Sequence, residues 1–244
     1  DSRAQHETAI VVFSQASSFT DTKQLPSRSF QIGDHFVQLE QRWKNDGKGG
    51  TTLGHGATVY NAAFVLSEYL ARNRPLLEGQ RVVELGTGPG LVAIAAALHG
   101  ASQVIATDGD EDVVDLARCN IQANLGSLES CPELLSRCSA EVLMWGDLDK
   151  GAAIGAPFDV VLAADVAACP YEHAYSNLVN SLEQLSKNDS TILISYQRRH
   201  HSEDLFFEIL SAKFHITWIP KADLHFDFIN SNIDIFRCKP KDGA

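Results

Sequence analysis

The chain has 244 residues, of which 44% are apolar and 21% charged, and its formal net charge is −11. This length fits one large domain, or one domain with an added lobe, and the composition is that of a globular protein that buries a sizeable core. The acidic balance and the lack of a long Lys or Arg run argue against a wide nucleic-acid-binding face, and no stretch reaches the roughly eighteen apolar residues of a membrane span.

The N-terminal part is predicted to be β-structure. Residues 8–13 are apolar, and residues 29–32 and 35–43 are predicted strands separated by Gly33 and Asp34, a tight-hairpin signal. The glycine-rich run 45–50 is a predicted loop. We therefore expect a small N-terminal β extension over residues 1–55 and a second domain over residues 56–244.

The second domain begins with a predicted helix, capped by Thr58 and ending near Arg72, before Pro75. From there strands and helices alternate, which predicts a mainly parallel sheet with helices on both faces. The predicted strands are 81–85, 103–107, 139–144, 159–163, 190–196, 214–219 and 233–238; the predicted helices are 90–99, 111–124, 172–186 and 202–212; and the segments 125–138 and 151–157 are predicted loops. The last two strands have no helix between them and predict an antiparallel hairpin at one edge.

Glycines cluster where the first of these strands meets its helix. Residues 82–90 read VVELGTGPG, with Gly86, Gly88 and Gly90 in a turn that needs close backbone approach. The third glycine comes one residue earlier than in the dinucleotide-binding pattern G-x-G-x-x-G. Glu84 lies two residues before the first glycine, where it would repel a pyrophosphate but could pair with a cationic amino group.

A second carboxylate, Asp108, ends the next strand. Glu84 and Asp108 therefore lie at the same edge of the predicted parallel sheet, where open α/β sheets bind their ligands. Asp108 could accept hydrogen bonds from both hydroxyls of a ribose, or it could cap the helix 111–124. The backbone N–H groups of Thr87 and Leu91, at a helix N-terminus, are predicted to bind a ligand carboxylate.

Several segments together resemble family-16 protein-lysine methyltransferases, a seven-strand class that uses S-adenosylmethionine (SAM). The similar segments are GATVYNAA (56–63), VELGTGPGL (83–91), NIQAN (120–124), LMWGD (143–147), FDVVLAAD (158–165) and ISYQR (194–198). The resemblance implies a Rossmann-like seven-strand sheet with helices on both faces, SAM as the cofactor, no metal, and methylation of a nitrogen on a protein, most often lysine.

The resemblance also implies a set of cofactor-binding residues. Tyr60 and Trp145 could stack on adenine or the sulfonium, or they could belong to the core. Asp147 could accept a hydrogen bond from the adenine amino group, or it could cap a turn. The complete predicted set is Tyr60, Glu84, Gly86, Thr87, Gly88, Gly90, Asp108, Trp145, Asp147 and Ala164.

The catalytic motif of the family is altered. Its D-x-x-Y pattern reads Asp165-Val-Ala-Ala168, so the Asp is present and the Tyr is Ala. Asp165 is predicted to orient the acceptor amine, with a loop-bound acid as the alternative. Tyr171 follows three residues later, after Pro170, and could either fold into the pocket or begin the helix 172–186 outside it.

The remaining expectations concern partners and alternatives. An acidic chain would attract a basic protein substrate, and we expect a monomer that binds neither membrane nor nucleic acid. Five scattered cysteines without a C-x-x-C pair fit reduced thiols and a cytoplasmic, also nuclear, protein. The cluster RRHH at 198–201 is interpreted as a solvated loop. Because the family Tyr is missing, methylation of arginine or a small molecule, or a catalytically silent SAM-binding interaction module, stays open; an NAD-linked reductase is disfavoured by the early third glycine.

Overall fold

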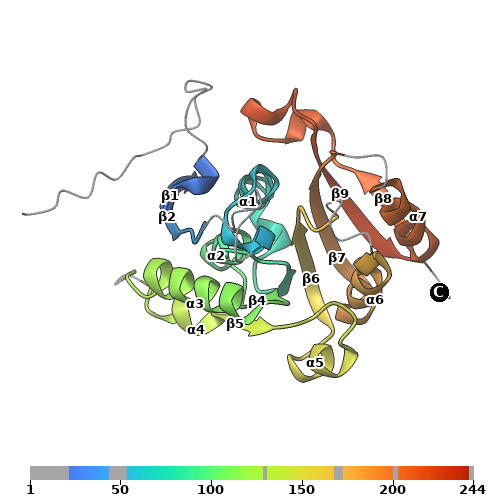
Figure 1. Ribbon diagram of the computed structural model, residues 1–244, viewed down its shortest axis with the longest axis horizontal. Helices are drawn as coiled ribbons and strands as arrows, with labels where there is room; N and C mark the ends of the chain where they lie inside the picture. The colour runs from blue at the N-terminus through green and yellow to red at the C-terminus, as the bar shows by residue number, and fades with distance from the viewer. Residues whose placement is uncertain (1–21, 44–53, 129–130, 168–172, 200–202, 242–244) are drawn as a thin grey trace, which may run out of the picture.

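A seven-stranded sheet forms the centre of the computed structural model, which describes residues 22–43, 54–128, 131–167, 173–199 and 203–241. The strand order is β5-β4-β3-β6-β7-β9-β8 (Figure 1). The strands are β3 (Arg81–Leu85), β4 (Gln103–Asp108), β5 (Cys138–Val142), β6 (Phe158–Ala164), β7 (Ser186–Gln197), β8 (Phe214–Trp218) and β9 (Ile233–Pro240). Strands β3 to β7 pair in parallel, whereas β9 pairs antiparallel with both β7 and β8. The predicted mixed sheet and its antiparallel edge are therefore confirmed.

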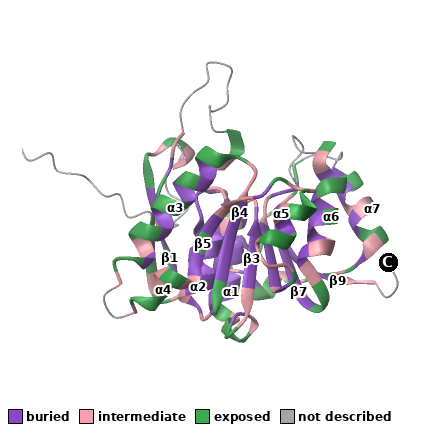
Figure 2. Cartoon of the chain, turned by 90° about the horizontal axis from the view of Figure 1, so that it is seen from below, coloured by how far each residue is buried: buried purple, intermediate pink, exposed green. Residues whose placement is uncertain are grey.

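Helices cover both faces of this sheet, as predicted. On one face, α1 (Asn61–Arg72), α2 (Leu91–Leu98) and α3 (Glu111–Leu125) share one hydrophobic core with the strands. On the other, α6 (Tyr175–Leu185) and α7 (Asp204–Lys213) share a second core. Figure 2 shows the strands buried between helices whose outer surfaces are exposed. The strands read as nearly continuous apolar runs because both of their faces are covered.

The N-terminal hairpin packs into the first of these cores. Its strands β1 (Ser27–Ile32) and β2 (His35–Glu40) pair antiparallel, with Ile32 opposite His35 across the predicted two-residue turn. Phe30 and Val37 of the hairpin are buried with the apolar residues of α1 and α2. The division of the chain at residue 55 stays a prediction.

Two asparagines of α3 bind the free edge of β2. The amide of Asn120 accepts from the backbone N–H of Glu40 at 2.8 Å and donates to its carbonyl at 3.1 Å. The amide of Asn124 does the same for Gln38, at 2.9 and 2.8 Å. Side chains four residues apart lie on one face of α3, and residues two apart present their backbone groups on one edge of β2. The two side-chain amides therefore bind this edge as the backbone of a neighbouring strand would. Asn120 also donates to the carbonyl of Pro89, which ties the hairpin to the glycine-rich turn.

Short helices replace parts of the predicted loops. Segment 125–138 contains α4 (Glu133–Arg137), and α5 (Leu148–Ala153) overlaps the predicted loop 151–157. The 3₁₀ helices are η1 (Thr22–Gln24), η2 (Gly54–Ala57), η3 (Arg74–Leu76), η6 (Lys221–Asp223) and η7 (Phe226–Phe228). The predicted strand 8–13 and loop 45–50 lie outside the described residues. Within the described ranges, no helix is both long and apolar enough to cross a bilayer.

One predicted cap is wrong. Helix α1 begins at Asn61 with Tyr60 at its N-cap and no side-chain capping bond. The hydroxyl of Thr58 instead donates to the side-chain carbonyl of Gln41 at 2.7 Å. Thr58 therefore anchors the segment before α1 to the end of β2.

Candidate functional site

A cavity of ≈ 760 Å³ lies at the carboxyl ends of β3, β4 and β6. The chain runs from β3 outward to β4 and β5, then returns to β6 on the other side of β3. Such a reversal leaves a crevice at the strand ends, the usual ligand position in open α/β sheets. Of the predicted cofactor-binding residues, eight line this cavity: Tyr60, Glu84, Gly86, Thr87, Gly88, Asp108, Trp145 and Ala164. Asp165 lines it as well.

Glu84 is the buried carboxylate of this cavity, with 1% of its surface exposed. Its Oε2 accepts from the hydroxyl of Thr87 at 2.7 Å and from the backbone N–H of Ala93 at 2.9 Å. Burial raises the pKa of Glu84 to about 8, although both hydrogen bonds act in the opposite direction. A cationic ligand group beside Glu84 would offset the cost of ionising it.

The glycine-rich turn brings backbone to the cavity wall. Gly86 and Gly88 have φ angles of +70° and +52°, a region that other residues rarely adopt. A Cβ at Gly86 would lie 2.8 Å from the side chain of Val166. The turn therefore needs glycine both for its conformation and for the space beside it.

Asp108 stabilises this turn from the next strand. Its Oδ2 accepts from the backbone N–H of Gly88 at 3.1 Å, and burial raises its pKa. The alternative role as a helix cap is wrong, because α3 is capped by Asp110, which accepts from the N–H groups of Asp112 and Val113. Asp108 keeps its place on the cavity wall.

Three other predictions are not supported by the geometry. Asp147, although described, does not line the cavity; its Oδ1 accepts from the backbone N–H of Lys150 at 2.9 Å and caps α5, the alternative role that the sequence left open. Gly90 is likewise described but not a lining residue; it is the N-cap of α2, with φ +96°. The backbone N–H of Thr87 donates to the carbonyl of Thr107 at 2.8 Å, so it is already engaged. Thr87 contributes to the site through its hydroxyl.

The far end of the cavity holds an ion pair that the sequence did not predict. Both guanidinium Nη atoms of Arg199 bind the two carboxylate oxygens of Asp165, at 2.7 and 2.5 Å. The side chain of Asp165 is only 7% exposed, and that of Arg199 is 34% exposed. Hydrogen bonding to Asp165 raises the pKa of Arg199 further. Arg199 is exposed, as expected for the predicted solvated loop 198–201, but it also pairs with Asp165 and lines the cavity.

Asp165 has an unusual backbone. Its φ is +62°, the one positive value among the described residues other than glycine. The backbone N–H of Asp165 donates to the carbonyl of Ser195 at 2.8 Å, which holds this conformation against β7. Left-handed residues other than glycine cost energy and concentrate at functional sites. This conformation turns the chain sharply where β6 ends.

Cations surround Tyr60 beside this ion pair. The Nζ of Lys23 lies 4.8 Å from the centre of the Tyr60 ring, and the Cζ of Arg199 lies 5.8 Å from it. The Nδ1 of His55 lies 3.0 Å from the Tyr60 hydroxyl, and burial together with Arg199 lowers the pKa of His55. The π face of Tyr60 therefore already interacts with the chain's own cations. Sequence reasoning missed Lys23 and His55, which lie outside its motifs.

Two residues of the altered catalytic motif cannot be placed. Ala168 and Tyr171 lie outside the described residues, so the position of Tyr171 relative to the pocket stays a prediction. Two residues not predicted from the sequence, Met144 and His173, also line the cavity. Met144 belongs to the quoted LMWGD segment, so a signal for it was present.

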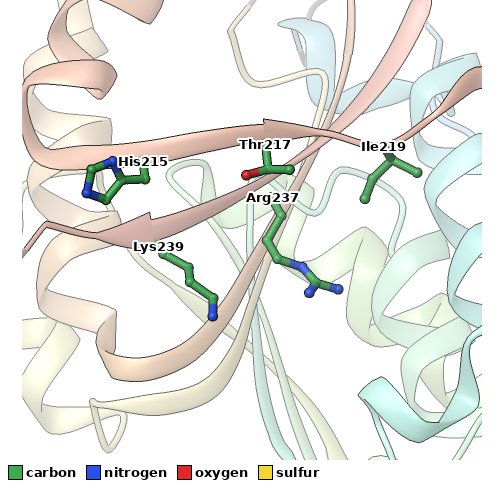
Figure 3. A pocket seen from close by; sticks show the side chains of 5 residues that line it. All are labelled: His215, Thr217, Ile219, Arg237 and Lys239. Carbon is green, nitrogen blue, oxygen red and sulfur yellow. The ribbon is translucent and has the colours of Figure 1, made fainter.

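A smaller cavity of ≈ 360 Å³ lies on the edge hairpin of the sheet (Figure 3). It is lined by His215, Thr217 and Ile219, on or just after β8, and by Arg237 and Lys239 of β9. None of these five residues carries a carboxylate, and none belongs to the predicted site. The larger cavity is therefore the candidate functional site.

Comparison with known proteins agrees with this geometry. The sequence model of a family described as lysine methyltransferases matches residues 41–213. Protein N-lysine methyltransferase METTL21A of Mus musculus is 33% identical over 203 residues, which cover 82% of this chain and 85% of the relative. EEF1A lysine methyltransferase 3 of Mus musculus is 29% identical over 234 residues, 93% of this chain and 87% of the relative.

Solved structures share the fold. Ribosomal protein L11 methylase from Lactobacillus delbrueckii subsp. bulgaricus aligns with a TM-score of 0.55 at 17% identity, covering 87% of this chain and 98% of that protein. Magnesium protoporphyrin IX methyltransferase from Synechocystis, solved with bound SAM, aligns with a TM-score of 0.53 at 20% identity, covering 74% and 79%. At these identities the likeness concerns the fold.

Proposed function

The chain belongs to the lysine methyltransferase family, and from that premise we propose how its main cavity transfers a methyl group from SAM to a lysine nitrogen of a protein substrate. One observation carries the proposal. The same cavity joins the buried Glu84 and the half-buried Asp108, beside the glycine-rich turn, to the strained, paired Asp165 at its other end. This arrangement supports a cofactor half and an acceptor half that lie next to each other in the cavity.

The cofactor half fits the chemical groups of SAM. Glu84 is a buried acid with a raised pKa, so a cation such as the α-ammonium would stabilise its ionised form. Asp108 supplies a carboxylate for the two ribose hydroxyls, and Trp145 supplies an aromatic face for the adenine or the sulfonium. Gly86, Gly88 and Ala164 leave the wall free of large side chains. When bound, SAM supplies a methyl group on a good leaving group.

The acceptor half is assigned to the end of β6. Asp165 and the carbonyl of Ala164 orient the lysine amine toward the methyl carbon, since transfer depends mainly on alignment and on loss of the ammonium proton. Tyr171 is proposed to complete this pocket in place of the family Tyr, three residues after Ala168.

The same proposal includes the charge of the substrate, the oligomeric state, the location and the domain division of the protein. The net charge of −11 supports a basic protein substrate, and disfavours nucleic acid. We propose a monomer that acts in the cytoplasm and the nucleus, in which residues 1–55 form an N-terminal extension to the methyltransferase domain 56–244.

A labelling experiment tests this function. The purified protein is incubated with methyl-labelled SAM and a cell extract, and the labelled acceptor is identified by mass spectrometry. We expect one or a few protein bands that carry methyl-lysine. Methyl-arginine or a labelled small molecule would replace lysine as the assigned acceptor. Tight SAM binding without any labelled acceptor would make the protein a silent interaction module.

A further inference from the structure

Arg199 pairs with the carboxylate of Asp165, the group proposed above to orient the acceptor lysine. Its guanidinium binds both oxygens of Asp165, and its Nη1 also donates to the carbonyl of Gln197 at 3.0 Å. Asp165 accepts a further bond from the backbone N–H of Gln197 at 3.3 Å. A planar guanidinium on a planar carboxylate is a strong and specific arrangement, which one lysine ammonium cannot reproduce.

The position of Arg199 is fixed from behind. Its backbone N–H donates to Oε2 of Glu203 at 3.0 Å, and the hydroxyl of Tyr196 donates to the same oxygen at 2.5 Å. Glu203 has none of its surface exposed, so this anchor is inside the protein. The segment after β7 is therefore hydrogen-bonded to a buried carboxylate at the point where Arg199 meets Asp165.

The other charged side chains of the cavity do not replace the negative charge of Asp165 that Arg199 neutralises. Among the described residues, the titratable side chains that line the cavity are Lys23, His55, Tyr60, Glu84, Asp108, Asp110, Asp165, His173 and Arg199. Glu84 and Asp108 belong to the proposed cofactor half, and Lys23 adds a positive charge beside Tyr60. With Asp165 neutralised by Arg199, the described side chains of the acceptor half present no net negative charge to an incoming lysine.

We propose, resting on the lysine methylation proposed above, that Arg199 is a positioning residue that neutralises Asp165 so that the acceptor lysine is held as the free amine. The ε-ammonium releases its proton to water, and the amine lone pair then forms the N–C bond while the electrons of the C–S bond stay on sulfur. An unpaired carboxylate would instead bind and stabilise the ammonium, which has no lone pair to react. Arg199 thus weakens binding of the unreactive form.

Substitution of Arg199 should therefore change the pH dependence of the reaction. Single-turnover rates are measured from pH 6 to 10 with saturating SAM and the purified, unmethylated acceptor found in the labelling experiment. An unpaired carboxylate within about 4–6 Å of an amine raises its pKa by about 1–3 units. In R199Q the acidic limb should move up by about one to two pH units, which lowers the rate at pH 7 by about 10- to 100-fold, and the difference from the wild type should narrow as the pH rises.

Binding of the acceptor gives a second readout. With S-adenosylhomocysteine bound, R199Q should bind the unmethylated acceptor more tightly than the wild type at pH 7, because the freed carboxylate attracts the ammonium. R199K keeps the charge and should keep the acidic limb close to that of the wild type. R198Q is the matched control: Arg198 pairs with exposed Asp204, and its loss should change neither readout.

Specific results would overturn the proposal. A rate that falls equally at every pH in R199Q, or weaker acceptor binding, would show that Arg199 only supports the local structure. If R199Q does not fold, the wild type decides: a rate that still rises about tenfold per pH unit up to pH 10, as an amine with the ordinary lysine pKa of about 10.4 would give, would contradict a site that favours the free amine. Failure of the proposed function is seen earlier and separately, since the wild type would then label no lysine.

Discussion

Replacement of Glu84 by Gln tests the cofactor half of the site most directly. The amide oxygen of Gln can keep the two hydrogen bonds from Thr87 and Ala93, so the turn has the same partners as in the wild type. What the variant loses is the ability to carry a negative charge. A charge-assisted contact with the α-ammonium contributes about 1.5–3 kcal/mol, so affinity for S-adenosylhomocysteine should fall about 10- to 150-fold.

The raised pKa of Glu84 also predicts that ligand binding releases protons. With a pKa of about 8, Glu84 is mostly protonated at pH 7 in the ligand-free protein. Pairing with the ammonium requires the carboxylate, so binding at pH 7 should release most of one proton from Glu84.

The raised pKa of Glu84 also makes the stability of the ligand-free protein depend on pH. Between the ordinary pKa and about 8, the folded protein holds more protons at Glu84 than the unfolded chain. Stability contributed by this group is therefore present at low pH and is lost as pH rises toward 8. The melting temperature of the ligand-free wild type should fall relative to that of Glu84→Gln between pH 5.5 and 8.

Isothermal calorimetry in buffers of different ionisation enthalpy measures both affinity and the number of protons exchanged. S-adenosylhomocysteine is the ligand, because it carries the same α-amino group and cannot be consumed. Wild-type affinity together with unchanged proton release in Glu84→Gln would refute the assignment of Glu84 to the ammonium. Circular dichroism confirms that the variant is folded.

Three further experiments, with five substitutions, test other parts of the structure. Asp165→Ala should reduce single-turnover methyl transfer about 100-fold through misplacement of the acceptor, while calorimetry shows S-adenosylhomocysteine affinity changed only severalfold; a wild-type rate would remove Asp165 from the acceptor site. Gly86→Ala and Gly54→Ala both place Ala at positive φ, which costs about 1–2 kcal/mol, but only the first meets a side chain at 2.8 Å, so urea unfolding should show the larger loss for Gly86→Ala. Asn120→Ala should destabilise the protein by about 1–3 kcal/mol in the same assay, and more than Asn124→Ala, because Asn120 is buried; equal losses would contradict this ranking.

The sequence by itself determined the order and type of most elements. Period-2 and helical patterns are local, and the alternation of strands and helices constrains the sheet to be parallel with covered faces. Given a parallel sheet, residues that end successive strands must meet at one edge. Glu84, Asp108 and Asp165 could therefore be predicted to share a cavity, and they do.

Side-chain partners, in contrast, depended on the tertiary structure. Asp165 pairs with Arg199, 34 residues away, because a left-handed backbone at Asp165 and the buried anchor behind Arg199 bring the two together. The sequence showed only a basic cluster there. From the sequence, Asp147 could bind the adenine amino group or cap a turn. In the structure it lies at the start of α5 and accepts a hydrogen bond from the backbone N–H of Lys150.

The same holds for the N-terminal hairpin. The asparagines of α3 were visible as a motif, but their partners on β2 lie 80 and 86 residues away. Periodicity specifies which face of an element is buried, since that depends on the repeat of the backbone alone. Which polar groups meet across the chain depends on the relative placement of whole elements, and this is set by packing of the complete core.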